Sequence, residues 1–185
     1  MARTPSNMLP LGTKAPHFNL QDTVSGEHLS LNNLKGNIGT VIMFICNHCP
    51  FVIHVNKELV ALSNAYFSKG ISFVAISSND AINYPQDSPD KMKVHAEVEN
   101  YAFPYLYDET QEVANAYDAA CTPDFYIFDK DLELVYRGQL DDSRPGNNLP
   151  VNGKDLRHAL DCLLEKKQNT ANQKPSIGCN IKWKN

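Results

Sequence analysis

Residues Gly39–Ser77 constrain the fold more than any other part of the sequence. They begin with an apolar, β-branched run, Gly39–Ile45, which is typical of a strand buried on both faces. After Pro50 the apolar residues recur at helical spacing until Gly70, a natural helix end, and Ile71–Ser77 is a second apolar run. A strand, a helix and a strand in this order predict two parallel strands joined by a right-handed crossover.

The rest of the chain continues the alternation of strands and helices. Helical patterns run from Pro89 to about Asn100, through the segment TQEVANAYDA (110–119) and through the amphipathic segment GKDLRHALDCLLEKK (153–167). The stretches Phe125–Phe128 and Leu132–Arg137 predict an antiparallel hairpin. The sequence therefore predicts an α/β sandwich.

The two ends of the chain are expected to pack on this sandwich. Residues 8–38 mix Pro, Gly and Asn with short apolar pieces and predict a small hairpin or an irregular entry segment. The tail, residues 168–185, ends in SIGCNIKW, whose Ile177, Ile181 and Trp183 predict docking. We expect a single domain over residues 8–185, with the tail as its extension.

Composition narrows the class of protein. The chain has 185 residues, of which 42% are hydrophobic, and its formal net charge is −4 without a basic stripe. This argues against a nucleic-acid or membrane-surface partner. The N-terminus lacks the apolar core of a signal peptide, and no apolar run is long enough to span a membrane. We therefore expect a cytoplasmic protein, in which five cysteines are catalytic or incidental rather than structural staples.

Two cysteines stand where the first apolar strand meets its helix, in VIMFICNHCPF (41–51). Cys46 is expected at the helix N-terminus, where unpaired N–H groups and the helix dipole would lower the pKa of its thiol. Cys49 is three residues on, a spacing that permits a reversible disulfide. A partly charged His48 between them would further favour a Cys46 thiolate and make the pair relatively oxidising.

Two other interpretations compete with a redox pair. Both cysteines can be inert core residues, because an unpaired cysteine is often buried. Alternatively, Cys46, Cys49 and either His48 or His54 can bind zinc or copper. Structural zinc sites usually pair two ligand clusters, and the sequence has no second Cys-x-x-Cys. We therefore expect no metal and no other cofactor.

Several segments together resemble one family of thioredoxin-fold proteins. They are VIMFICNHCPF, GISFVAISSND, YPQDSPDKM, FPYLYDETQEVANAY, CTPDFYIFDKD with LVYRGQLDD, and SIGCNIKW. The chain resembles the AhpC/TSA redoxins, in their peroxiredoxin-like branch that carries Cys-x-x-Cys, from about Leu11 to Trp183. The resemblance implies a thioredoxin-like three-layer sandwich, in which helices flank a central mixed β-sheet, with an N-terminal hairpin and a C-terminal tail extension.

The same resemblance implies roles for individual residues. Cys46 matches the exposed nucleophilic cysteine and Cys49 the buried resolving cysteine. Thr122 and Pro123 match the residue and cis-proline that face the thiols, and the Thr122 backbone would pair with an extended substrate strand. His48 matches a histidine found in strongly oxidising relatives.

The sequence departs from the peroxidase pattern of this family. When Cys49 is set on the peroxidatic cysteine, Cys46 takes the place of the required threonine and Ile42 that of the required proline. The expected arginine is also missing, and Arg137, on the next strand, is a poor substitute. Without these groups to polarise a peroxide, fast peroxide reduction is not expected. A weak antioxidant peroxidase remains an alternative.

Two further thiols are candidates for the same chemistry. Cys121 precedes Thr122 and can relay a disulfide or simply fill space, and Cys179 in the tail can resolve a mixed disulfide or pack among apolar residues. Cys162, on the last predicted helix, is expected only to pack. The function expected from the sequence is thiol–disulfide exchange with a protein or small-molecule disulfide or dithiol. An electron donor would reduce the pair, and the protein would be a monomer or a homodimer.

Overall fold

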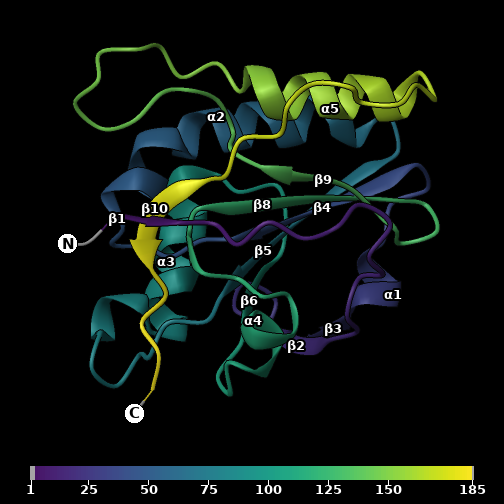
Figure 1. Cartoon of the computed structure of the whole chain (residues 1–185). Helices are drawn as coiled ribbons and strands as arrows, with labels where there is room; N and C mark the ends of the chain where they lie inside the picture. Colours follow the sequence, from purple (N-terminus) through teal and green to yellow (C-terminus); the bar gives the residue numbers. More distant parts are fainter. Residues whose placement is uncertain (1–2, 185) are drawn as a thin grey trace.

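The predicted strand–helix–strand unit forms the centre of the molecule. In the computed structural model, which describes residues 3–184, β4 (Gly39–Phe44) lies parallel to β5 (Ile71–Ser77). The crossover between them is α2 (Pro50–Phe67) (Figure 1). Pro50 suits the start of this helix, because its missing N–H would have no partner there. Gly70, with φ of +84°, turns the chain from the end of the helix into β5.

The central sheet has seven strands and is mixed. Its order is β3–β2–β6–β5–β4–β8–β9, in which β5 pairs in parallel with β4 and β6 and the other neighbours are antiparallel. The further strands are β2 (Asn19–Asp22), β3 (His28–Ser30), β6 (Tyr105–Tyr107), β8 (Asp124–Asp129) and β9 (Leu134–Gly138). The hairpins expected near the N-terminus and around residues 125–137 are thereby confirmed.

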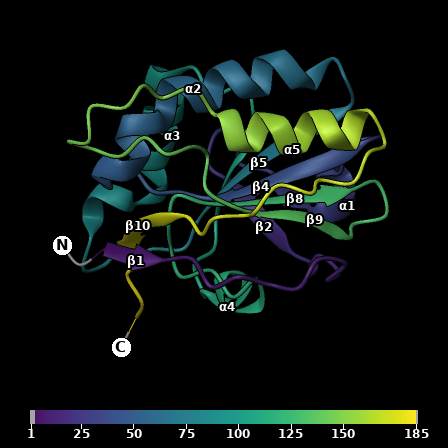
Figure 2. The same cartoon turned by 45° about the horizontal axis from the view of Figure 1, so that its top comes forward.

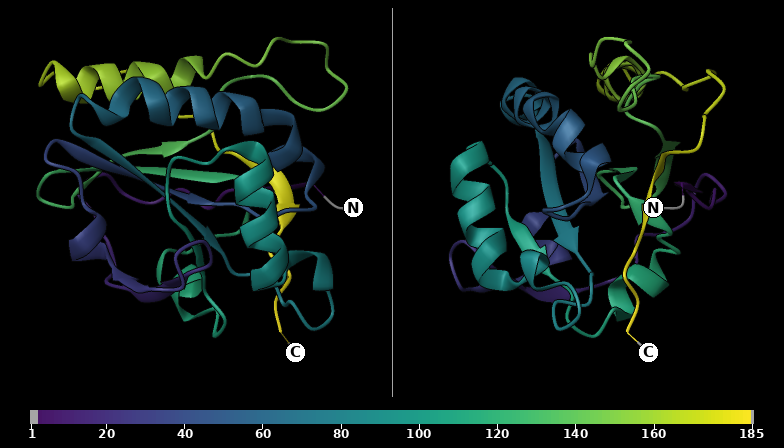
Figure 3. Two further views of the ribbon diagram at one scale, coloured as in Figure 1. Left: turned by 180° about the vertical axis from the view of Figure 1, so that it is seen from behind. Right: turned by 90° about the vertical axis from the view of Figure 1, so that its left-hand side faces the viewer.

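Helices cover both faces of this sheet. Val41 and Met43 of β4 pack with α2, α3 (Pro89–Glu99) and α5 (Lys154–Leu164), whereas Ile42 and Phe44 pack with α1 (Leu31–Leu34) and α4 (Glu112–Ala116). Successive side chains of a strand point to opposite faces of the sheet. Because helices cover both faces here, every side chain of β4 is buried, and both faces of the strand are apolar. Figures 2 and 3 show the three layers, with α2 and α5 side by side over the sheet. The predicted sandwich is confirmed.

The tail docks on the domain as a strand, which the sequence pattern did not predict. Strand β10 (Ile177–Asn180) lies between β1 (Arg3–Pro5) and β7 (Cys121–Thr122) in a small antiparallel sheet. The two ends of the chain therefore lie side by side (Figure 1). Strand β1 lies before residue 8, where we expected the domain to begin.

The residues that anchor the tail differ in part from those expected. Ile181 is buried, as predicted, but Ile177 and Trp183 are 38% and 40% exposed. Cys179, in the middle of β10, is buried instead. None of the helices within residues 3–184 combines the length and apolarity needed to span a bilayer.

Candidate redox site

The site lies at the C-terminal end of β4, where the chain leaves the sheet and enters α2. Cys46 stands in this connection, and Cys49 is the N-cap residue of the helix, immediately before Pro50. The expectation that Cys46 occupies the helix N-terminus is therefore wrong, because the helix begins four residues later than Cys46. The helix N-terminus instead favours negative charge on Cys49.

Thr122, which the resemblance placed opposite the thiols, contacts both of them. Its hydroxyl lies 3.5 Å from the sulfur of Cys46, and its carbonyl oxygen accepts a hydrogen bond of 3.1 Å from the Cys49 thiol. The peptide bond between Thr122 and Pro123 is cis, as expected. The chain thus brings together the Cys-x-x-Cys and a turn more than 70 residues away in the sequence.

Both thiols are buried in this structure. The exposed fraction of Cys46 is 1% and that of Cys49 is 0%. Cys46 therefore differs from the exposed nucleophile that the resemblance implies. A substrate can reach it only when the residues around the site move.

Asp87 is a member of the site that the sequence did not reveal. Its fully buried carboxylate accepts hydrogen bonds from the backbone N–H of Asn47 at 2.9 Å and from the side-chain amide of Asn79 at 2.8 Å. Nδ1 of His48 lies 2.6 Å from the same carboxylate. The one available signal was its place in the loop after β5, beside the carboxyl end of β4, where sites in α/β sheets usually form.

The protonation of each thiol depends on that of the other, because the two interact. Hydrogen bonding between the two thiols raises the pKa of Cys46, and burial and the Asp87 carboxylate raise it further. The same interaction, together with the side chains of Cys179 and Thr122, lowers the pKa of Cys49 to about 5. Burial and the Asp87 carboxylate thus oppose a negative charge on Cys46, whereas the surroundings of Cys49 favour one; the Cys46 thiolate stays a prediction.

The structure separates the three remaining cysteines. The sulfur of Cys179 lies 2.9 Å from that of Cys49, so this tail residue joins the site. Cys121 is buried next to Thr122, but its thiol turns toward the carbonyl oxygen of Pro123 at 3.7 Å. Cys162, on α5, lies near His158 and packs outside the site. Of the two alternatives left open for each residue, these contacts favour packing for Cys121 and a place in the site for Cys179.

A three-residue group near the thiols has the donor types of a metal site. One ligand atom each from Cys46, His48 and Asp87 lie within 4.8 Å of one another. Cys49 and His54, which the sequence offered as ligands, do not belong to this group. Both oxygens of Asp87 already accept hydrogen bonds, so a metal ion would have to compete with the contact between His48 and Asp87.

His54 has a different role from metal binding. Its Nε2 lies 2.8 Å from the hydroxyl of Ser143, which joins α2 to the loop between β9 and α5. This loop borders a shallow hollow next to Phe51 and Pro123.

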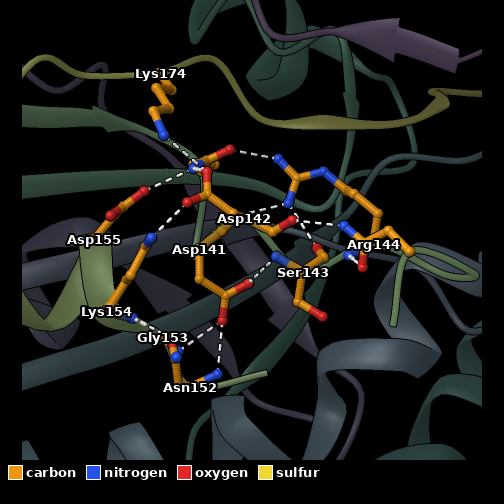
Figure 4. Close-up of polar contacts among 11 residues, drawn as sticks. Asp141, Asp142, Ser143, Arg144, Asn152, Gly153, Lys154, Asp155 and Lys174 are labelled. Atoms are coloured by element: carbon orange, nitrogen blue, oxygen red, sulfur yellow. Dashed lines mark hydrogen bonds and ion pairs between the residues drawn. The ribbon is translucent and has the colours of Figure 1, made fainter. Parts of the chain in front are cut away.

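The loop is held in shape by a network of polar contacts (Figure 4). The Asp141 carboxylate accepts hydrogen bonds from the backbone N–H groups of Ser143, Asn152 and Gly153, at 2.7–2.8 Å. Asp142 pairs with Lys154 and with Lys174 of the tail. The network thereby joins the loop, α5 and the tail beside the site.

Arg137 is structural in every contact it makes here. It is fully buried, and its Nη2 lies 3.0 Å from the carboxylate of Asp124. It also donates to the hydroxyl of Ser6 and to the carbonyl oxygen of Asp118. These contacts engage the guanidinium group of Arg137. They support the expectation that Arg137 does not replace the arginine that polarises the peroxide in peroxidases of this family.

Comparison with known proteins agrees with this architecture. Residues 11–137 match the AhpC/TSA family. The thiol-disulfide oxidoreductase ResA of Bacillus subtilis is 28% identical over 129 residues, which are 67% of this chain and 64% of ResA. The chain thus matches somewhat less than two thirds of that relative's length.

Two solved structures are similar over nearly their whole length. An uncharacterized conserved protein of Geobacillus kaustophilus is 64% identical, with a TM-score of 0.98 over 100% of this chain and 97% of that one. A hypothetical protein of Sinorhizobium meliloti is 44% identical, with a TM-score of 0.95 over 98% of both chains. With the thioredoxin-like sandwich and the family match over residues 11–137, these findings show that the chain belongs to the AhpC/TSA family of thioredoxin-fold redoxins.

Proposed function

We propose that this protein is a thiol–disulfide oxidoreductase whose redox centre is the pair Cys46 and Cys49. The observation that carries the proposal is the contact of Thr122 with both sulfurs at the entrance of α2, through its hydroxyl to Cys46 and its carbonyl oxygen to Cys49. Two thiols in this relation can form a disulfide with a small movement. Relationship to ResA supports the same reaction class.

The titration of the pair suggests how Cys46 is activated. When the pair loses its first proton, the charge lies on Cys49, which then no longer donates to the carbonyl oxygen of Thr122, and Cys46 keeps its proton. As the Cys46 sulfur bonds to one sulfur of a substrate disulfide, its proton passes to the Cys49 thiolate, and the other substrate sulfur leaves as a thiolate. Cys49 thus acts as the general base for its neighbour.

The second step releases the reduced substrate. Cys49 loses its proton and attacks the Cys46 sulfur in the mixed disulfide, and the bound substrate sulfur leaves with the electron pair. The two departing sulfurs take up protons, so the substrate gains two electrons and the Cys46–Cys49 disulfide forms. In the reverse direction, the same steps oxidise a substrate dithiol, whether in a protein or a small molecule.

The test is a redox titration of the pair. The protein is equilibrated in glutathione buffers, trapped with N-ethylmaleimide and digested with trypsin. Residues 36–57 form one tryptic peptide that contains both cysteines, so its oxidised form loses two hydrogens and takes up no label. A reduction potential near about −270 mV would indicate a reductant and one near about −120 mV an oxidant. If this peptide never becomes oxidised in wild-type or Cys179→Ser protein, the proposal is wrong.

A metal-binding module is the second candidate, favoured by the Cys46, His48 and Asp87 group. Its donor set suits Zn²⁺ with a fourth position open. The measurement is the zinc and copper content of protein purified under reducing conditions. One tightly bound ion per chain, lost in Asp87→Asn but kept in Asp90→Asn, would support this module in place of the redox enzyme.

A further inference from the structure

Strand β10 presents its cysteine to the site in a defined register. Cys179 lies directly opposite Thr122 in the antiparallel pair of β10 with β7, and Asn180 lies opposite Cys121. Gly178 permits this close approach, because a Cβ atom there would lie 1.9 Å from the carbonyl oxygen of Thr122. The same carbonyl oxygen accepts the hydrogen bond from Cys49. Backbone pairing and the thiol contact therefore converge on one residue.

The distance between the two sulfurs is short enough for bond formation. They are 2.9 Å apart, whereas a disulfide bond is about 2.05 Å long. Cys179 is only 2% exposed, so the contact is shielded from solvent. No rearrangement of the backbone on the scale of a loop is needed to close this gap.

We propose that Cys179 is a third redox thiol, which takes over Cys49 from the Cys46–Cys49 disulfide. This inference rests on the proposed function, since it requires that disulfide as its starting point. The Cys179 sulfur, as a thiolate, attacks the sulfur of Cys49. The bond between Cys46 and Cys49 breaks, and its electron pair leaves with the Cys46 sulfur, which takes up the proton lost by Cys179.

The exchange changes which thiol is reduced and leaves the number of electrons unchanged. Cys46 returns as a thiol, and the oxidation is stored as a Cys49–Cys179 disulfide between α2 and the C-terminal strand. Burial and the hydrogen bond and charge of Cys49 raise the pKa of Cys179 to about 12. Once Cys49 is part of a disulfide it has no charge, so one cause of this raised pKa disappears when Cys179 must react.

The pairing of β10 with β7 also gives the tail the position of a substrate. Strand β10 pairs with β7 at Thr122, the residue that contacts both thiols of the pair. The chain therefore carries its own thiol substrate, held in place by the strand and by the salt bridge of Lys174 with Asp142 (Figure 4).

The experiment uses Cys46→Ser protein, in which Cys49 can react only with another partner. The protein is oxidised with oxidised glutathione, trapped with N-ethylmaleimide and digested with trypsin without reduction. Residues 168–182 form one tryptic peptide, because Lys174 precedes a proline. We expect this peptide to be linked to residues 36–57 in protein that runs as a monomer. The link should persist in Cys46→Ser/Cys162→Ser and be lost in Cys46→Ser/Cys179→Ser.

A different set of products would overturn the proposal. If Cys46→Ser accumulates only glutathione adducts or intermolecular dimers, Cys179 is not a redox partner of Cys49. Cys179→Ser protein tests the proposed function separately, since it should still form the disulfide within residues 36–57. If Cys46→Ser does not fold, the test uses wild-type protein, in which mass-spectrometric fragmentation shows which cysteines are linked. If no Cys49–Cys179 link appears at any ratio of reduced to oxidised glutathione, the proposal is overturned.

Discussion

Nδ1 of His48 lies 2.6 Å from the buried carboxylate of Asp87, which holds the histidine between the two thiols. The carboxylate also binds the backbone N–H of Asn47, which fixes the loop that carries Cys46. The negative charge of Asp87 raises the pKa of Cys46. The reactivity of Cys46 therefore depends on how far His48 offsets that charge.

Asp87→Asn should make Cys46 more acidic. The amide keeps the size of the side chain but removes the negative charge that disfavours a second thiolate. Cβ NMR shifts of isotope-labelled cysteines, followed against pH, should show a lower pKa for Cys46. The rate of reaction with a small disulfide at pH 7 should rise roughly three- to tenfold. Asp90→Asn, at an exposed position on α3, is the matched control and should change neither.

His48→Ala should have the opposite effect. Without the imidazole, the charge of Asp87 acts on Cys46 with less compensation, so the pKa of Cys46 should rise. Loss of a neighbouring imidazole also makes the negative charge of the reduced pair less favourable, so its potential should become more reducing. Glutathione equilibration measures the potential, and NMR titration measures the pKa. An unchanged potential in His48→Ala would show that the contact with Asp87 serves only to shape the loop.

The pH dependence of the reduced pair should reflect Cys49. Its pKa of about 5 means that the thiolate signal grows as pH rises through about 5 and is complete by about 7. The hydrogen bond from Cys46 is the largest cause, so Cys46→Ala should shift this transition to higher pH. The thiolate absorbance in the ultraviolet measures it directly. A wild-type protein with no thiolate at pH 7 would contradict the charge placement.

Gly178→Ala should push β10 away from β7. A Cβ atom at this position overlaps the carbonyl oxygen of Thr122, so the strand must shift. Cys46 and Cys49 should then react faster with N-ethylmaleimide, by roughly tenfold if the opening is local. Gly146→Ala is the control: the φ of +84° strains an alanine there, but its Cβ atom would meet no other residue, so the effect stays in the loop before α5. Equal labelling rates in the two variants would mean that β10 does not restrict access to the site.

Arg137→Met should destabilise the fold without altering the redox pair directly. The change leaves the Asp124 carboxylate buried without its partner, which typically costs about 3–5 kcal/mol. The double variant Asp124→Asn/Arg137→Met should recover part of this loss, because no isolated charge remains. Denaturant unfolding measures both. Lys14→Met, which removes an exposed ion pair with Glu133, should cost less than about 1 kcal/mol.

Local patterns in the sequence were sufficient for most of the architecture. The apolar run that leads to Cys46 predicts β4, and the change to helical spacing after Pro50 predicts α2, because the period of apolar residues matches the geometry of the element. The resemblance added the cis peptide bond at Pro123. The strand and the helix depend on residues that are neighbours in the sequence, so local patterns are enough to predict them. The cis peptide bond depends on the fold that the chain shares with its family, so the resemblance is enough to predict it.

By itself, the sequence determined an α/β sandwich with two thiols where a central strand meets a helix. Only the tertiary structure decided the surroundings of those thiols: the burial of Cys46, the carboxylate of Asp87 beside it and the sulfur of Cys179 against Cys49. Cys49 and Cys179 are 130 residues apart, and no local period relates them. Their contact follows from the pairing of the last strand with β7, and it adds to the effect of Cys46 in lowering the pKa of Cys49.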